Sequence, residues 1–181
     1  MPTEKRVLLI GQGITAGSAL QSLLGRFEVV GVIRKNDPGD DVIRFADSSG
    51  VTLFPDTSLA GVARAIERTD PHAVVVSSYD RILPADLISG RPFVNVHYAP
   101  LPRYRGRATV NWAILNGESH CAISIHALAP GLDAGGILFQ RAVPIGSADT
   151  VTDLYRRLNA IQRDELADAV ARRLDGDEGV P

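Results

Sequence analysis

The chain has 181 residues, of which 45% are hydrophobic and 22% are charged. A chain of this length normally folds as one unit, so we expect residues 1–181 to form a single domain. The composition is typical of a folded globular protein and excludes an intrinsically disordered chain. The formal net charge is -2, from 19 basic and 21 acidic residues. Because the chain lacks a strong positive field, we expect no nucleic-acid partner.

The cysteine content and the apolar runs exclude further classes. Cys121 is the one cysteine, so it cannot form an internal disulfide. No cluster of cysteine and histidine has the spacing of a zinc site, and we expect no metal. The apolar runs are too short to cross a bilayer, and residues 1–6 lack a signal-peptide pattern. We therefore expect a cytoplasmic protein that does not bind membranes, whose oligomeric state the sequence does not indicate.

The first half of the chain alternates apolar runs with amphipathic stretches. Residues 5–10 are apolar and lead through Gly11-Gln12-Gly13 into a helical pattern, and residues 27–33 form a second apolar run. The other expected elements of this half are helices at 40–49, 58–68 and 84–88 and strands at 72–77 and 93–97. This alternation predicts a parallel sheet whose strands are connected by helices.

The second half begins with a loop at residues 101–107 that is rich in proline, arginine and glycine. A helix is expected from residue 108 to about 116, followed by strands at 121–128 and 137–145 at the less regular end of the sheet. Thr150 is the expected N-cap of a last helix that stops before Gly176. The predicted fold class is α/β, an open, mostly parallel Rossmann-like sheet with helices on both faces.

The turn Gly11-Gln12-Gly13 joins the first strand to the first helix, and ligands of open α/β sheets bind at such strand ends. Its backbone N–H groups could hold a phosphate-sized anion, so we predict that Gly11, Gln12 and Gly13 bind substrate. The turn also loosely fits a dinucleotide fingerprint, with Arg34 placed to face a 2′-phosphate. A tight turn that needs glycine for its backbone conformation explains the same residues equally well.

Asn95 and His97 lie two residues apart at the end of a predicted strand, so their side chains project on the same side. An amide can hold an oxyanion while an imidazole moves a proton. Asp133 lies among glycines in a later loop and could orient and charge His97. Taken alone, an N-x-H triplet is more often a hydrogen-bonded strand end. His126 is expected to be a satisfied strand histidine, with a place in the site wall as the alternative.

Three segments together resemble the folate-dependent formyltransferase family over nearly the whole chain. They are Asn95-Val96-His97, Leu101-Pro102-Arg103-Tyr104-Arg105-Gly106 and Gly131-Leu132-Asp133-Ala134-Gly135. The family pattern N-x-H-x-S-L-L-P-x-x-x-G, then a helix and a G-x-D-x-G loop, is matched in order and approximate spacing. The chain departs from the pattern after His97, where it reads Tyr98-Ala99-Pro100-Leu101-Pro102 and many members have a serine and two leucines before the proline, so its acceptor side is expected to be unusual.

The resemblance implies a formyltransferase fold and an enzyme that transfers a formyl group from 10-formyltetrahydrofolate to a primary amine of a small-molecule or carrier-bound acceptor. Asn95 would help hold the formyl oxygen, His97 would stabilise the intermediate and move a proton, and Asp133 would organise His97 and a water. The donor would lie against two segments. Their residues are Tyr79, Arg81, Ile82 and Leu83 in the first, and Ala129, Pro130, Gly131 and Leu132 in the second.

The arginines of the 101–107 loop point to an anionic acceptor. Arginine grips phosphate or carboxylate groups well, and we predict that Arg103 and Arg105 bind substrate, whereas Arg107 is as readily a solvated residue. The chain stops at Pro181 without the C-terminal β-barrel that family members acting on tRNA add, so tRNA is not the expected acceptor. Two alternatives stay open. One is a 10-formyltetrahydrofolate hydrolase, and the other is a non-catalytic dinucleotide-binding module that uses the glycine turn.

Overall fold

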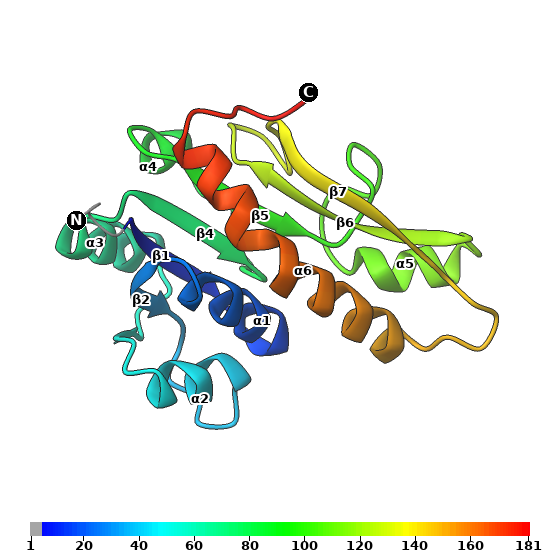
Figure 1. Cartoon of the computed structure of the whole chain (residues 1–181), viewed down its shortest axis with the longest axis horizontal. Helices are drawn as coiled ribbons and strands as arrows, with labels where there is room; N and C mark the ends of the chain where they lie inside the picture. Colours follow the sequence, from blue (N-terminus) through cyan, green and yellow to red (C-terminus); the bar gives the residue numbers. More distant parts are fainter. Residues whose placement is uncertain (1–4) are drawn as a thin grey trace.

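The computed structural model describes residues 5–181 and contains a seven-stranded sheet in the order β3-β2-β1-β4-β5-β6-β7 (Figure 1). Residues 1–4, to which part of the signal-peptide prediction refers, lie outside the described residues. The strands are β1 (Arg6–Gly11), β2 (Glu28–Ile33), β3 (Leu53–Phe54), β4 (Ala73–Ser77), β5 (Phe93–His97), β6 (His120–Ala127) and β7 (Ile137–Pro144). The helices are α1 (Gly13–Leu24), α2 (Asp41–Ser48), α3 (Leu59–Thr69), α4 (Ala85–Ile88), α5 (Thr109–Leu115) and α6 (Val151–Leu174).

The sheet has a parallel part and an antiparallel part. The strands from β3 to β5 pair in parallel, whereas β6 runs antiparallel to both β5 and β7. The prediction of an open, mostly parallel α/β sheet is thus confirmed. The two-residue strand β3 was not expected from the sequence, because a run this short carries no periodicity. It forms by pairing Leu53 and Phe54 with the edge of β2.

Helices cover both faces of the sheet, as the sequence predicts. On one face α1, α2, α5 and α6 pack over the sheet through a large apolar core that includes Leu9, Val75 and Leu158. On the other face α3 packs against alternate residues of the same strands, including Leu8 and Val74. This split follows from the two-residue period of a strand, since both faces of a central parallel strand are buried.

Two helix starts show how the sequence sets the element boundaries. Thr150 caps α6 through a reciprocal pair with Asp153, in which each side chain accepts a hydrogen bond from the other residue's backbone N–H. Asp40 caps α2 by accepting a hydrogen bond from Val42 N. In Figure 1, α6 lies over the sheet between α1 and β7, and it packs mainly on α1 and the last two strands. This helix therefore joins the parallel and antiparallel parts.

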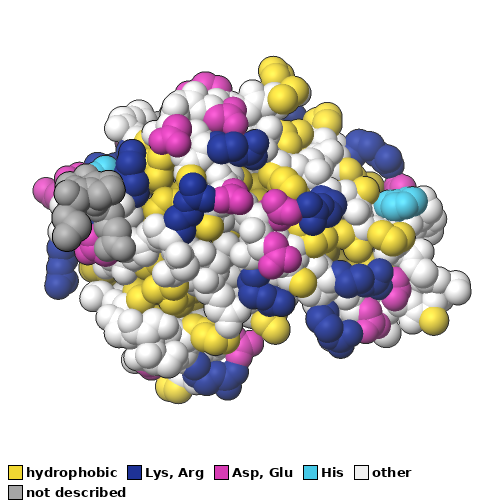
Figure 2. Space-filling view, viewed as in Figure 1, with side chains coloured by type: hydrophobic (Ala, Val, Ile, Leu, Met, Phe, Trp, Pro, Cys, Tyr) yellow, Lys and Arg dark blue, Asp and Glu magenta, His cyan; other side chains and the backbone are white. Residues whose placement is uncertain are grey.

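The surface over α6 carries charges of both signs close together. On the face shown in Figure 2, dark blue and magenta side chains lie next to one another. Arg141 pairs with Glu165, and Arg26 pairs with Asp168. Within residues 5–181, no helix is long and apolar enough to cross a membrane.

Candidate functional site

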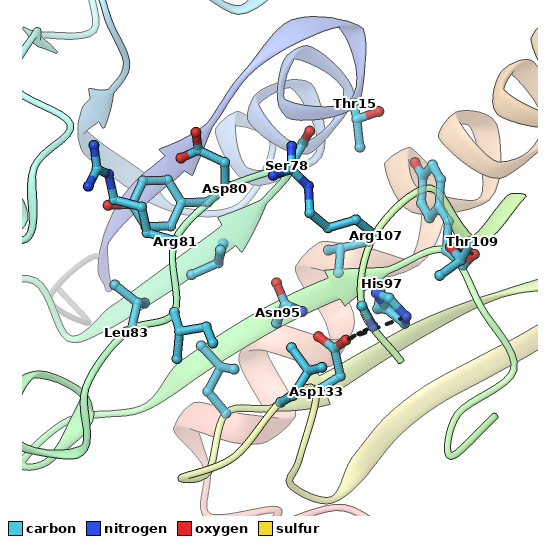
Figure 3. A pocket seen from close by; sticks show the side chains of 18 of the residues that line it. Thr15, Ser78, Asp80, Arg81, Leu83, Asn95, His97, Arg107, Thr109 and Asp133 are labelled. Atoms are coloured by element: carbon cyan, nitrogen blue, oxygen red, sulfur yellow. Dashed lines mark hydrogen bonds and ion pairs between the residues drawn. The ribbon is translucent and has the colours of Figure 1, made fainter. Parts of the chain in front are cut away.

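A cleft of about 580 Å³ opens at the carboxyl ends of β1, β4 and β5 (Figure 3). The chain crosses from one side of β1 to the other between β3 and β4, so the sheet order reverses here. Open α/β sheets bind their ligands at such a point. Gln12 follows β1, Ser78 follows β4 and His97 ends β5, and all three line the cleft. The fold thus gathers side chains from distant segments into one cavity.

Asn95 and His97 are on β5 and both line the cleft, as the sequence predicts from their spacing. In the antiparallel pairing of β5 with β6, Asn95 lies opposite His126. The Asn95 Nδ2 atom donates a hydrogen bond to His126 Nε2 at 3.1 Å. This contact fixes the orientation of the Asn95 amide and leaves its second Nδ2 hydrogen for a ligand.

His126 is fully buried and its hydrogen bonds define its tautomer. Its Nδ1 atom lies 2.9 Å from the carbonyl oxygen of Ala127, which can only accept, so Nδ1 carries the proton. Nε2 of the neutral ring is then the acceptor that Asn95 requires. Burial lowers the pKa of His126 below its ordinary value, so the neutral form is favoured. The expectation of a satisfied strand histidine agrees with this geometry, and its partner is the site amide.

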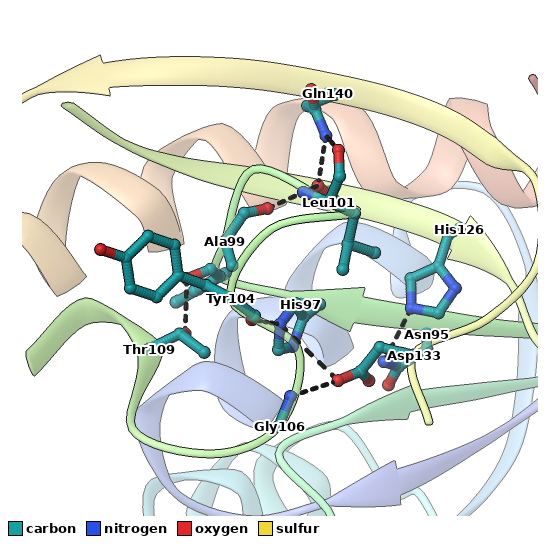
Figure 4. Close-up of polar contacts among 12 residues, drawn as sticks. Asn95, His97, Ala99, Leu101, Tyr104, Gly106, Thr109, His126, Asp133 and Gln140 are labelled. Carbon is teal, nitrogen blue, oxygen red and sulfur yellow. Dashed lines mark hydrogen bonds and ion pairs between the residues drawn. The ribbon is translucent and has the colours of Figure 1, made fainter. Parts of the chain in front are cut away.

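His97 and Asp133 come together although they are 36 positions apart in the sequence. His97 Nε2 lies 3.7 Å from Asp133 Oδ2, and the two side chains are only 9% and 13% exposed. His97 Nε2 also donates to the carbonyl oxygen of Tyr104 at 2.7 Å. Asp133 Oδ2 in turn accepts from Gly106 N at 2.7 Å. The 101–107 loop thus holds both side chains (Figure 4).

This arrangement fixes where a proton can move. Because Tyr104 O can only accept, Nε2 of His97 keeps its proton in both the neutral and the charged ring. The proton that His97 can exchange is therefore the one on Nδ1. The Asp133 carboxylate lies close enough to the same Nε2 atom to help orient the ring. The site combines an amide donor, a proton-carrying imidazole and a carboxylate, which are the groups that acyl transfer uses.

A buried polar network holds the turn that begins the 101–107 loop. Ser124 Oγ on β6 donates to Ala99 O at 2.6 Å, and Gln140 Nε2 on β7 donates to Ser124 Oγ at 2.8 Å. Gln140 Nε2 also donates to Leu101 O at 3.0 Å (Figure 4). The antiparallel strands therefore position the loop that carries the partners of His97 and Asp133. No pattern in the sequence predicts this network, since it depends on the register between β6 and β7.

One wall of the cleft is apolar and open. Of the residues predicted to bind the donor, all but Pro130 line the cleft, namely Tyr79, Arg81, Ile82, Leu83, Ala129, Gly131 and Leu132. Ile82 is 70% exposed and Leu132 is 50% exposed. Exposed apolar side chains facing a cleft favour a ligand with a flat apolar face. The hydroxyl group of Tyr79 donates to Thr57 O at 2.8 Å and so ties this wall to the loop before α3.

The predicted substrate-binding residues are placed less uniformly. Gln12 lines the cleft, but Gly11 and Gly13 do not. Gly11 is tightly packed, because a Cβ there would lie 2.0 Å from Ser77 O. Gly13 N donates to both carboxylate oxygens of Asp40, at 2.9 and 3.1 Å. The anion at this turn is therefore a side chain of the protein itself.

The three arginines of the loop have three different environments. Arg103 pairs with Glu118 at 2.7 Å and lies outside the cleft. Arg105 lines a second cavity of about 420 Å³, behind Asp133 and next to the C-terminal residues 178–181. Arg107 is the loop arginine that lines the main cleft. The sequence analysis found a solvated Arg107 as plausible as a substrate-binding one, yet Arg107 is the loop arginine that faces the main cleft.

Several residues at the end of the cleft near Gln12 and Arg107 were not singled out from the sequence as site residues. Thr15, Tyr98, Thr109 and Tyr155 all line the cleft beside Gln12 and Arg107. Tyr98 is buried, and its hydroxyl group lies 2.7 Å from Asn159 Oδ1 and 2.6 Å from Gln162 Oε1 on α6. Burial raises the pKa of Tyr98. The available signal was the segment after His97, where a tyrosine follows the site histidine directly and the chain then departs from the family pattern.

Curated relatives agree with the family resemblance. The chain is 41% identical over 128 residues to a methionyl-tRNA formyltransferase of Anaeromyxobacter dehalogenans, which covers 70% of this chain and 40% of the relative. It is 30% identical over 190 residues to a methionyl-tRNA formyltransferase of Thermosipho africanus, covering 97% of this chain and 62% of the relative. The chain thus spans less than two thirds of the length of these relatives.

Solved structures match the fold closely. A glycinamide ribonucleotide transformylase from Symbiobacterium toebii superposes with a TM-score of 0.83 at 24% identity, covering 97% of this chain and 90% of that protein. A formyltetrahydrofolate deformylase from Pseudomonas syringae has a TM-score of 0.80 at 22% identity, covering 96% and 62%. At this identity the match concerns the fold alone. The formyl transferase family model matches residues 25–170, which include Asn95, His97 and Asp133, and the chain belongs to the formyl transferase family.

Proposed function

We propose that this chain catalyses transfer of a formyl group from 10-formyltetrahydrofolate to a primary amine. The observation that carries the proposal is the convergence of Asn95, His97 and Asp133 in one cleft at the switch point of the sheet. Family membership supports the reaction class. The proposed acceptor is a small-molecule or carrier-bound amine, because the lining of the cleft carries two arginines, Arg81 and Arg107, rather than a broad basic surface.

The shape and chemistry of the cleft fit the proposed donor. A folate carries a flat heteroaromatic ring, and Ile82, Leu83 and Leu132 form an apolar wall on which such a ring can pack. Arg81 lines the same wall and offers a cation to the carboxylates of a folate tail. We call the end of the cleft near Gln12 and Arg107 the acceptor end. Asn95 lies between the apolar wall and this end, next to His97, where the formyl group must meet the amine.

In the proposed mechanism, negative charge develops on the formyl oxygen as the amine attacks. Asn95 donates its free Nδ2 hydrogen to this oxygen, and the adjacent protonated His97 stabilises the same charge. A fixed donor of this kind commonly lowers the barrier by about 3 kcal/mol. Because His126 already holds the other Nδ2 hydrogen, Asn95 needs little reorganisation during the reaction.

The protons balance through two groups. The attacking amine loses one proton, which Asp133 accepts directly or through a water molecule. The leaving nitrogen of the donor gains one proton, which His97 gives from Nδ1. The bond between the formyl carbon and the leaving nitrogen then breaks, and the bond between the formyl carbon and the acceptor nitrogen, which formed in the attack, becomes the new amide bond. Asp133 and His97 then exchange their protons with solvent, which restores the starting state.

The first test separates binding from chemistry. Calorimetric titration with 5-formyltetrahydrofolate, a stable donor analogue, should show saturable binding, and NADPH should show none. Binding of NADPH without the folate would contradict the proposal and favour the dinucleotide-binding alternative. The variant Asp86→Asn changes an exposed carboxylate on α4, and its binding of 5-formyltetrahydrofolate should equal that of the wild type.

A second measurement distinguishes transfer from hydrolysis. Incubation with 10-formyltetrahydrofolate should release tetrahydrofolate slowly in buffer and faster when an amine acceptor is present. A release rate that no amine changes, with formate as the product, would favour the hydrolase alternative. Formylated amine detected by mass spectrometry would establish transfer directly.

A further inference from the structure

The turn after β1 has the form of an anion site, yet a carboxylate of the protein already fills it. A glycine turn that leads into a helix normally offers N–H groups to a bound anion. Here Gly13 N donates to both oxygens of Asp40, at 2.9 and 3.1 Å. Asp40 comes from the loop before α2, 27 residues along the chain. The carboxylate thus occupies the position that a substrate phosphate would take at this turn.

The carboxylate of Asp40 is firmly held there. Its side chain is 5% exposed, and Oδ2 accepts from Arg34 Nε at 2.7 Å. Its Oδ1 atom also accepts from Val42 N at 3.0 Å, which caps α2. An incoming phosphate would have to break all of these contacts and approach a buried negative charge. Arg34, which the dinucleotide fingerprint placed to face a 2′-phosphate, therefore forms an ion pair with Asp40 instead.

The acceptor end of the cleft agrees with this exclusion. It reaches Gln12 and Thr15 but neither Gly11 nor Gly13. The groups that line this end are one amide, the hydroxyl groups of two threonines and two tyrosines, and one guanidinium group; they belong to Gln12, Thr15, Thr109, Tyr98, Tyr155 and Arg107. Arg107 can pair with an anionic group of the acceptor elsewhere in the cleft, but the amide and hydroxyl groups beside the turn suit a neutral polar group better than a phosphate.

We propose that Asp40 is a specificity-determining residue which blocks phosphate at the start of α1, so that the acceptor is an amine without a phosphate at that end. The statement about acceptors rests on the proposed function, because it presumes that the cleft formylates an amine. The statement about phosphate does not, because it concerns an unliganded turn.

The direct test follows the backbone amide of Gly13 by ¹H–¹⁵N NMR during titration with inorganic phosphate. In the wild-type chain this resonance should not shift. In Asp40→Asn, the N–H group of Gly13 and the guanidinium group of Arg34 lose their anion, and phosphate should shift the Gly13 resonance saturably. We expect phosphate to bind at least about tenfold more tightly than to the wild type, as charge-assisted contacts to arginine allow. Asp47→Asn, an exposed carboxylate on α2, is the matched control and should behave as the wild type.

The double variant Asp40→Asn/Arg34→Gln tests whether the new binding uses the released arginine, and it should lose most of the gain. A phosphate-dependent shift of Gly13 in the wild type would overturn the proposal. So would an unchanged Gly13 resonance in an Asp40→Asn variant that keeps the wild-type amide dispersion. These spectra need neither donor nor acceptor, so they stay decisive if the chain transfers no formyl group.

Acceptor rates give a second test that does not depend on the folding of Asp40→Asn. Wild-type chain should formylate glycinamide riboside at least as efficiently as glycinamide ribonucleotide, which differs by one phosphate. A wild-type kcat/KM for the ribonucleotide more than about tenfold higher would overturn the proposal, since that ratio is the gain expected from an open phosphate site.

Discussion

The carboxyl ends of β1 and β5 both carry polar motifs at the mouth of one cleft, but the structure uses them in opposite ways. At the end of β5, His97 and Asn95 face the cleft and each keeps a hydrogen-bonding position for a ligand. At the end of β1, Gly11 is packed against β4 and the amide of Gly13 is taken by Asp40. A motif at a strand end therefore predicts where a binding site can form. Whether its polar groups are free to bind a ligand depends on which other side chains of the protein contact them.

The largest effect that sharpens this comparison is expected at the β5 end. His97→Ala and Asp133→Asn should each reduce formyl transfer by about 10²- to 10⁴-fold, because each removes a group that carries a proton. Binding of 5-formyltetrahydrofolate should change little, since neither side chain belongs to the apolar wall. Single-turnover kinetics and calorimetry measure the two quantities. Activity close to wild type in either variant would contradict the roles given to this pair.

Asn95→Leu tests the amide separately from the proton-carrying groups. The variant keeps the approximate side-chain volume and removes the donor to the formyl oxygen, so turnover should fall by about 10²- to 10³-fold. It also leaves Nε2 of the buried His126 without its donor. Asn111→Leu, on the exposed face of α5, is the matched control and should leave turnover unchanged. Equal turnover in Asn95→Leu and the control would remove the amide from the mechanism.

At the β1 end, a substitution should change the free energy of unfolding rather than the rate of formyl transfer. In Gly11→Ala the new Cβ would lie 2.0 Å from Ser77 O, a backbone atom that cannot move without disturbing β4. We expect a loss of about 3 kcal/mol in the free energy of unfolding, the upper part of the usual overpacking range. Gly25→Ala is the control, because its Cβ would meet only an ordinary contact at 3.6 Å. Chemical denaturation of both variants measures the difference, and a Gly11→Ala variant as stable as the control would refute this packing argument.

The sequence predicted the elements well, because most of them are long enough to show a periodicity. It predicted the places of Asn95, His97 and Asp133 from spacing and family resemblance. It could not predict that Asp40 would reach Gly13, since this contact joins two loops and depends on how α2 packs on α1. The pairing of Asn95 with His126 likewise depends on the antiparallel register of β5 and β6.

The arginine loop shows the same limit at single residues. Composition indicated that its arginines bind an anion, but the backbone decides which of them faces the cleft. Tyr104 and Ala108 both adopt left-handed backbone conformations, with φ of +57° and +55°. Arg107 lies between these two bends and lines the cleft, whereas Arg103 lies before them and pairs with Glu118. No periodicity in the sequence encodes such bends.

The smallest effect we predict concerns the neutral histidine behind the β5 end. Burial lowers the pKa of His126 in the folded chain below its ordinary value of 6.5. As the pH falls below about 6.5, the unfolded chain therefore binds a proton that the folded chain does not, and folding loses up to about 1.4 kcal/mol per pH unit from this group. Its contribution is fully present above pH 6.5 and declines on acidification.

The variant His126→Gln keeps an amide that can accept from Asn95 and removes the titrating ring. The free energy of unfolding of the wild type should therefore fall more steeply between pH 7.5 and 5.5 than that of His126→Gln. His120→Gln, at the exposed start of β6, is the matched control and should retain the steep wild-type decline. Urea denaturation at a series of pH values measures these slopes. Parallel curves for wild type and His126→Gln would show that the ring titrates alike in the folded and unfolded chain, and the tautomer that holds Asn95 in place would then need another origin.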